Sequence, residues 1–108
     1  MPWLHYVAYF FGGLCCANSI PHLVSGMTGR AFQSPFAKPP GKGLSSSTMN
    51  VLWGGFNLAV GYALILHVGS FDLRDLAQAG VAGAGALMVS VYSALHFGQF
   101  HGGNSLTS

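Results

Sequence analysis

The sequence predicts an all-α integral membrane protein with three transmembrane helices. Only 6% of its 108 residues are charged and 51% are hydrophobic, whereas roughly 25% are charged in an ordinary soluble domain. The few charges leave three long uncharged runs, each longer than the ~20 residues that cross a hydrocarbon core of ~30 Å as a helix. Barrel strands would alternate strictly between apolar and polar residues, and no such alternation is present. We therefore expect residues 1–108 to form a single membrane domain surrounded by lipid.

The first helix is expected at about residues 3–27, inside a stretch from 2 to 29 without Asp, Glu, Lys or Arg. This stretch lacks a basic leading region and a clear A-x-A site, so it does not have the pattern of a cleaved signal peptide. Cys15 and Cys16 are adjacent near its middle. We interpret them as small packing residues rather than as a disulfide or a metal site.

A basic loop rich in Pro, Gly and Ser follows at residues 30–48, and the second helix is expected at about 49–69. The loop carries Arg30, Lys38 and Lys42, while both tails lack Lys and Arg. The positive-inside bias therefore places this loop in the cytoplasm, the amino terminus outside and the carboxyl terminus in the cytoplasm. The loop composition suits contact with anionic head groups, and a partner-docking surface is the alternative interpretation.

The third helix is expected at about residues 76–100, after the very short connection SFDLRD. Asp75, followed three residues later by Gln78, resembles a capping box that opens this helix. Because the connection is so short, we expect the last two helices to form a tight antiparallel hairpin.

Each predicted span carries small and polar residues at helical spacing, which is typical of close helix packing in lipid. The opposite faces, including Tyr9, Leu52 and Met88, suit lipid or a second subunit. The expected packing residues are Gly12, Ser19, Gly54, Asn57, Gly61, Ala82, Ala86 and Ser90. Three helices bury little surface by themselves, so these stripes favour a homo-oligomer or a place in a larger membrane complex.

Polar residues of different helices are expected to meet at one depth. At 1.5 Å per residue, His22 and His96 both lie roughly 12 Å from the membrane midplane, on the side of the basic loop. His5 and His67 lie on the opposite side, and His101 lies at the interface. Intramembrane ionisable residues invite a functional hypothesis. The candidate polar cluster consists of Asn18, His22, Asn50, Tyr92 and His96.

Three functions are compatible with this pattern. The first is a non-enzymatic structural or accessory subunit, in which the histidines form hydrogen bonds between helices. The second is a redox or metal-binding protein, in which His22 and His96 ligate haem, copper or zinc. The third is a small oligomeric transporter or channel lined by Asn50, Asn57 and serines. Catalysis is not expected, because the spans contain no carboxylate and no Ser-His-Asp pattern. The expected partners are the lipid bilayer and other membrane subunits, and no nucleic acid.

Overall fold

The computed structural model describes residues 2–105 and contains three long helices, α1 (Pro2–Met27), α2 (Ser47–Leu66) and α3 (Leu76–His101). A short helix, η1 (Gly103–Ser105), follows α3. All three long helices have the length and apolar composition needed to cross a membrane, which agrees with the predicted class. The second helix ends at Leu66 rather than at 69, because the chain leaves helical geometry at His67, whose N–H closes the last turn on Ala63.

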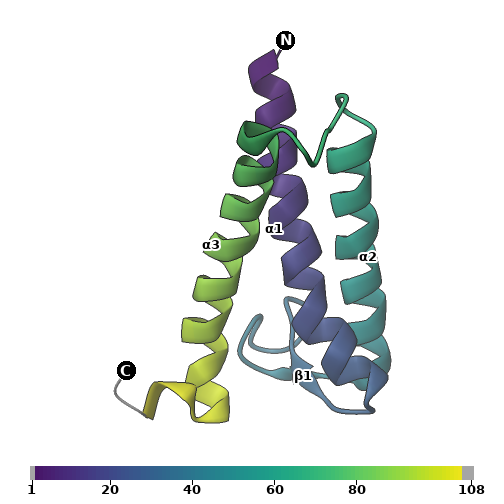
Figure 1. Ribbon diagram of the computed structural model, residues 1–108. Coiled ribbons are helices and arrows are strands. Elements are labelled where there is room, and N and C mark those ends of the chain that lie inside the picture. Colours follow the sequence, from purple (N-terminus) through teal and green to yellow (C-terminus); the bar gives the residue numbers. More distant parts are fainter. Residues whose placement is uncertain (1, 106–108) are drawn as a thin grey trace.

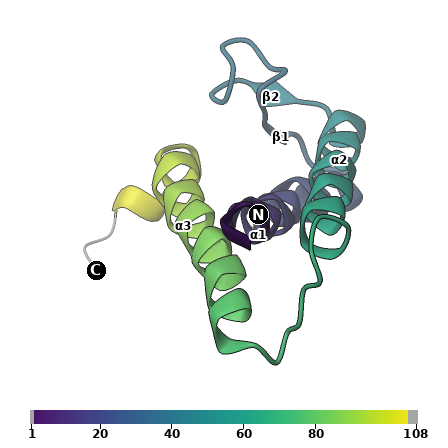
Figure 2. The ribbon, with the colours of Figure 1, turned by 90° about the horizontal axis from the view of Figure 1, so that it is seen from above.

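Helix α1 lies between the other two helices (Figures 1 and 2). Helices α2 and α3 run antiparallel, but each packs against α1, and seen from above they are splayed apart on either side of it (Figure 2). The expected tight hairpin of α2 and α3 is therefore not confirmed. The 67–75 connection allows this separation because it runs as an extended link between the two helix ends (Figure 2).

The α1–α2 interface is made by glycines that let the two backbones approach closely. A Cβ on Gly12 would lie 3.2 Å from the Gly61 carbonyl oxygen, and one on Gly61 would lie 2.9 Å from that of Gly12. A Cβ on Gly54 would lie 3.0 Å from the carbonyl oxygen of the buried Ser19. Any larger side chain at these positions would push the helices apart, as expected for small residues at a membrane helix interface.

The α1–α3 interface uses a different line of small residues. A Cβ on Gly13 would collide with the Ala82 carbonyl, and one on Gly85 would collide with the Phe10 carbonyl. The residues of α3 that are buried are Gly85 and Gly98, whereas the expected packing residues Ala86 and Ser90 are half-buried and exposed. The Ser90 hydroxyl donates to the Ala86 carbonyl within the same helix, so it does not contribute a bond between helices.

The loop between α1 and α2 is folded rather than irregular throughout. Strands β1 (Phe32–Gln33) and β2 (Leu44–Ser45) pair antiparallel, with Phe32 opposite Ser45. Ser34 and Ser45 are both buried, and their hydroxyls share a hydrogen bond of 2.6 Å. Ser46 then caps α2 by accepting from the Met49 N–H. This loop lies at the same end of the bundle as the end of α3 (Figure 1).

The opposite end of the bundle holds the start of α1 and the 67–75 connection (Figure 1). Asp75 is the N-cap of α3 and accepts from the Gln78 N–H, as predicted. The Gln78 side chain, however, accepts from the Asp72 N–H rather than reaching back to Asp75. Tyr9, expected on an outer face that suits lipid or a second subunit, is only 2% exposed, because Phe71 of the connection packs edge-on against its ring.

Candidate functional site

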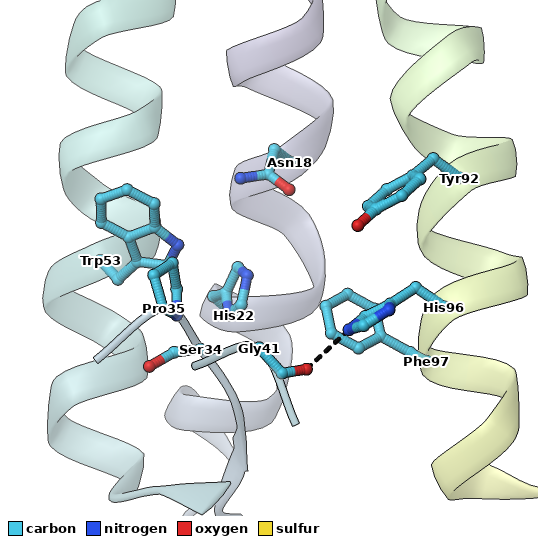
Figure 3. Close-up of a pocket in the computed structure, with 9 residues that line it drawn as sticks. All are labelled: Asn18, His22, Ser34, Pro35, Gly41, Trp53, Tyr92, His96 and Phe97. Atoms are coloured by element: carbon cyan, nitrogen blue, oxygen red, sulfur yellow. Dashed lines mark hydrogen bonds between the residues drawn. The ribbon is translucent and has the colours of Figure 1, made fainter. Parts of the chain in front are cut away.

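A cavity of about 160 Å³ lies at the loop end of the bundle, where all three helices and the loop contribute to its wall (Figure 3). Four of the five residues of the candidate polar cluster line it, and the fifth, Asn50, is hydrogen-bonded to His22. The lining residues are Asn18, His22, Ser34, Pro35, Gly41, Trp53, Tyr92, His96 and Phe97.

Asn50 is fully buried and determines which ring nitrogen of His22 carries a proton. Its side-chain NH2 group donates to the backbone carbonyls of Phe32, Ser45 and Ser46 at 3.0–3.3 Å, with one of its two N–H groups shared between two of them. Because these three neighbours are all acceptors, the amide atom beside them must be the NH2 nitrogen, and Oδ1 must be the atom that faces His22. The contact of 2.7 Å between Asn50 Oδ1 and His22 Nδ1 then requires a proton on Nδ1. A neutral His22 imidazole consequently has its free lone pair on Nε2.

This free nitrogen of His22 faces the cavity. His22 is 3% exposed, and Nε2 has no hydrogen-bond partner among residues 2–105. Every fully covered side-chain N or O atom in that part of the chain has a partner, so Nε2 retains a small accessible surface. Because His22 lines this cavity, we infer that the accessible surface of Nε2 opens into it. The cavity wall therefore contains one ring nitrogen held in a fixed orientation, which is a hydrogen-bond acceptor when the imidazole is neutral.

His96 has the opposite arrangement of its ring nitrogens. Its Nε2 lies 2.6 Å from the Gly41 carbonyl oxygen, which can only accept, so Nε2 carries the proton (Figure 3). Its Nδ1 lies 3.4 Å from the Gln99 side-chain nitrogen. The ring is stacked on Tyr92, with the two planes 4° apart. His96 thus fastens the loop to α3 and does not present a free nitrogen to His22.

Three further polar groups of the cavity wall have unused hydrogen-bonding capacity. The Asn18 side-chain nitrogen donates to Asn57 Oδ1, and Asn57 in turn donates to the Trp53 carbonyl. The Asn18 amide oxygen and the Tyr92 hydroxyl are turned toward each other, and the Trp53 indole nitrogen lies on the side facing His22 (Figure 3). None of these three atoms has a hydrogen-bond partner within the described part of the chain.

The geometry of the cavity limits which side chains could coordinate a metal ion or a haem iron. Of the two expected ligands, His22 offers Nε2, but His96 would have to release Gly41 before its own Nε2 could coordinate. Across residues 2–105, no three His, Cys, Asp or Glu side chains converge. A volume of about 160 Å³ is also below the ~300–1,000 Å³ of pockets that take drug-sized ligands, so a macrocycle such as haem would need the helices to move apart.

Sequence reasoning missed the loop and aromatic contributions to this site. Phe32 stacks against His101 with planes 9° apart, lies edge-on to His22, and contacts Phe97. His101 also reaches Gln33 Oε1 at 2.9 Å, so it belongs to the loop contact. The one available signal was compositional. Aromatic residues alternate with small polar ones in the loop, and two histidines, His96 and His101, stand at the end of the third span.

Comparison of this chain with protein-family models, with curated proteins and with solved structures finds no significant match.

Proposed function

We propose that this chain is a non-enzymatic integral membrane subunit that acts by associating with other subunits through the outer face of α3. The observation that carries the proposal is that only a small part of the α3 surface is buried against the rest of the chain. Within α3, Gly85 and Gly98 are the buried residues, and large apolar side chains such as Leu87 and Leu95 are exposed.

Small residues on that outer face support a helix partner as well as lipid. A Cβ added to Gly80 or Gly83 would meet no atom within 4 Å, so these glycines are not required for packing inside the chain. Glycine destabilises a helix by about 0.5–1 kcal/mol relative to alanine, and close approach of a second helix is the usual benefit in membranes. We therefore assign the association surface to the face of α3 that contains Gly80 and Gly83.

The chemistry of the cavity supports a non-catalytic role. Both carboxylates of the chain, Asp72 and Asp75, belong to the connection at the opposite end of the bundle from His22 and His96. The hydrogen-bond partners of those histidines in the described residues are neutral amides and a backbone carbonyl. Among the described residues no carboxylate lies beside either histidine to stabilise an imidazolium, so the arrangement lacks the acid–base pair of a Ser-His-Asp site.

The distribution of charge favours an orientation in which the loop end is cytoplasmic. Arg30, Lys38 and Lys42 belong to that end, together with the end of α3, whereas Arg74 is accompanied by two acids at the other end. Reporter fusions at each terminus test this orientation. A cytoplasmic amino terminus would contradict it.

The association is tested by measuring subunit exchange and oligomer size in lipid nanodiscs for Gly83→Leu. We expect Gly83→Leu to weaken association at least tenfold while leaving the helix content and thermal stability of the single chain unchanged. Gly55→Leu is the matched control, because Gly55 also lies in open space but on α2. A wild-type chain that is monomeric in native lipid, or equal effects of the two variants, would refute the proposal.

A further inference from the structure

We propose that the cavity at the loop end binds a neutral polyol, a group with neighbouring hydroxyls such as glycerol, supplied as a phospholipid head group or as a free solute. The proposal is independent of the association surface on α3. It rests on the volume, the hydrogen-bonding pattern and the charge of the cavity.

The volume suits a ligand of about the size of glycerol. The cavity measures about 160 Å³, and a cavity of ~150 Å³ in another protein accommodates benzene, which like glycerol has six non-hydrogen atoms. Its wall is mostly apolar but, unlike the apolar cavity of that example, it also contains polar atoms, so hydrogen-bonding groups are expected in the ligand. Part of the wall is aromatic, from Trp53, Tyr92 and Phe97, which suits the C–H faces of a polyol.

The wall requires both donors and acceptors from the ligand. His22 Nε2 and the Asn18 amide oxygen are acceptors, and the Trp53 N–H is a donor. The Tyr92 hydroxyl can act either way. A hydroxyl group donates one hydrogen bond and accepts others, so two neighbouring hydroxyls satisfy His22 and Asn18 as acceptors and Trp53 as a donor. The His22 acceptor has no donor among the described residues and is not fully covered, so a ligand hydroxyl can donate to it.

The charge around the cavity argues against an ammonium ligand. The basic residues Lys38 and Lys42 belong to the loop that forms part of the cavity wall, and both carboxylates of the chain belong to the opposite end. A bound cation would therefore meet like charge and no counter-ion. A phospholipid with a glycerol head group fits better, because Lys42, which follows the wall residue Gly41 and is exposed, is placed to meet its phosphate.

Tryptophan fluorescence provides the test, since the chain contains two tryptophans, Trp3 and Trp53. In a Trp3→Phe background, Trp53 alone reports on the cavity. This protein is placed in phosphatidylcholine nanodiscs, and the emission is followed with phosphatidylglycerol, with phosphatidic acid, with free glycerol, and with 1,2-dimethoxyethane, which keeps the oxygen spacing of a diol but has no hydroxyl.

A saturable response to phosphatidylglycerol but not to phosphatidic acid identifies a lipid source, and a response to glycerol but not to dimethoxyethane identifies a free polyol. Tyr92→Phe should weaken either response by roughly 3- to 10-fold, the loss of one hydrogen bond. Tyr62→Phe is the matched control, because Tyr62 is similarly exposed (55% against 62%) and its ring packs against that of His67, tilted by 55°, at the other end of α2.

A second readout does not depend on any substitution. The ¹⁵N resonance of the unprotonated His22 Nε2 should move upfield when a hydroxyl donates to it. Equal responses to phosphatidylglycerol and phosphatidic acid would mean charge attraction by the loop alone and would overturn the proposal. No response to any polyol, or equal effects of Tyr92→Phe and Tyr62→Phe, would overturn it as well.

Discussion

Replacing Asn50 with leucine, an apolar residue of similar size, should destabilise this protein more than the same kind of change at any other polar residue in its helices. The Asn50 side chain forms four hydrogen bonds, one with His22 and three with the carbonyls of Phe32, Ser45 and Ser46. Side-chain hydrogen bonds in membrane proteins contribute about 0.6 kcal/mol each on average, so four bonds contribute about 2–3 kcal/mol. The buried Nδ1–H of His22 would also lose its acceptor, at a cost of about 1–3 kcal/mol.

Asn50→Leu should therefore lower the free energy of unfolding by about 3–6 kcal/mol. Reversible unfolding in mixed micelles of mild detergent and dodecyl sulfate, followed by circular dichroism, measures this change. Asn57→Leu is the control: its amide is also buried but forms two hydrogen bonds, to Asn18 and to the Trp53 carbonyl, worth about 1 kcal/mol.

A double variant separates the lost bonds from the orphaned donor. When His22 is also changed to leucine, no unsatisfied N–H remains, and replacing both partners of a bond by apolar groups can be nearly neutral. The double variant should therefore be less destabilised than the sum of its two single variants, by about 1–3 kcal/mol. Additive effects would contradict the assignment of the His22 proton to Nδ1, and an Asn50→Leu cost no larger than that of Asn57→Leu would contradict the hydrogen-bond network described for Asn50.

Two further predictions concern the packing of α3 and its bond to the loop. Gly85→Ala should lower the free energy of unfolding by about 1–3 kcal/mol, because the added Cβ would overlap the Phe10 carbonyl of α1. Gly83→Ala is the control: Gly83 lies in open space, so this change should be neutral or slightly stabilising in the monomer. Equal effects of the two variants in the same unfolding assay would contradict the packing described. His96→Phe keeps an aromatic ring but removes the N–H that holds Gly41, so trypsin should cleave after the neighbouring Lys42 several-fold faster than in wild type, and an unchanged cleavage rate would show that this bond does not restrain the loop.

The positions of the helices could be predicted from the sequence, but their order in space could not. Uncharged runs longer than a membrane thickness determine where the spans lie, and few alternatives satisfy the backbone in lipid. The arrangement of the helices in space depends instead on which face of α1 packs against α2 and which packs against α3. Gly12 and Gly13 are adjacent and point about 100° apart, and they face α2 and α3 respectively. The sequence pattern revealed the line through Gly12, and the shorter line through Gly13 and Gly85 was not distinguishable from ordinary small-residue content.

The candidate site could be predicted only where depth in the membrane determines proximity. His22 and Asn50 lie at matched depth on neighbouring helices, so counting residues was enough to bring them together. The position of Gly41 on the cavity wall, hydrogen-bonded to a residue 55 positions away, depends on the path of the loop. That path is set by the pairing of Phe32 with Ser45 and by the buried hydroxyls of Ser34 and Ser45, and neither leaves a periodic signal in the sequence.

The central position of α1 also determines how the chain can be assembled in a membrane. Consecutive helices that pack on each other can insert and fold as a unit, but α2 and α3 each depend on α1 for their packing. Helix α3 therefore completes its fold by docking on α1, and the 67–75 connection joins it to α2 at one end only. The same docking surface on α1 of a neighbouring copy is chemically identical, so exchange of α3 between copies requires no new interface, only a different path for residues 67–75.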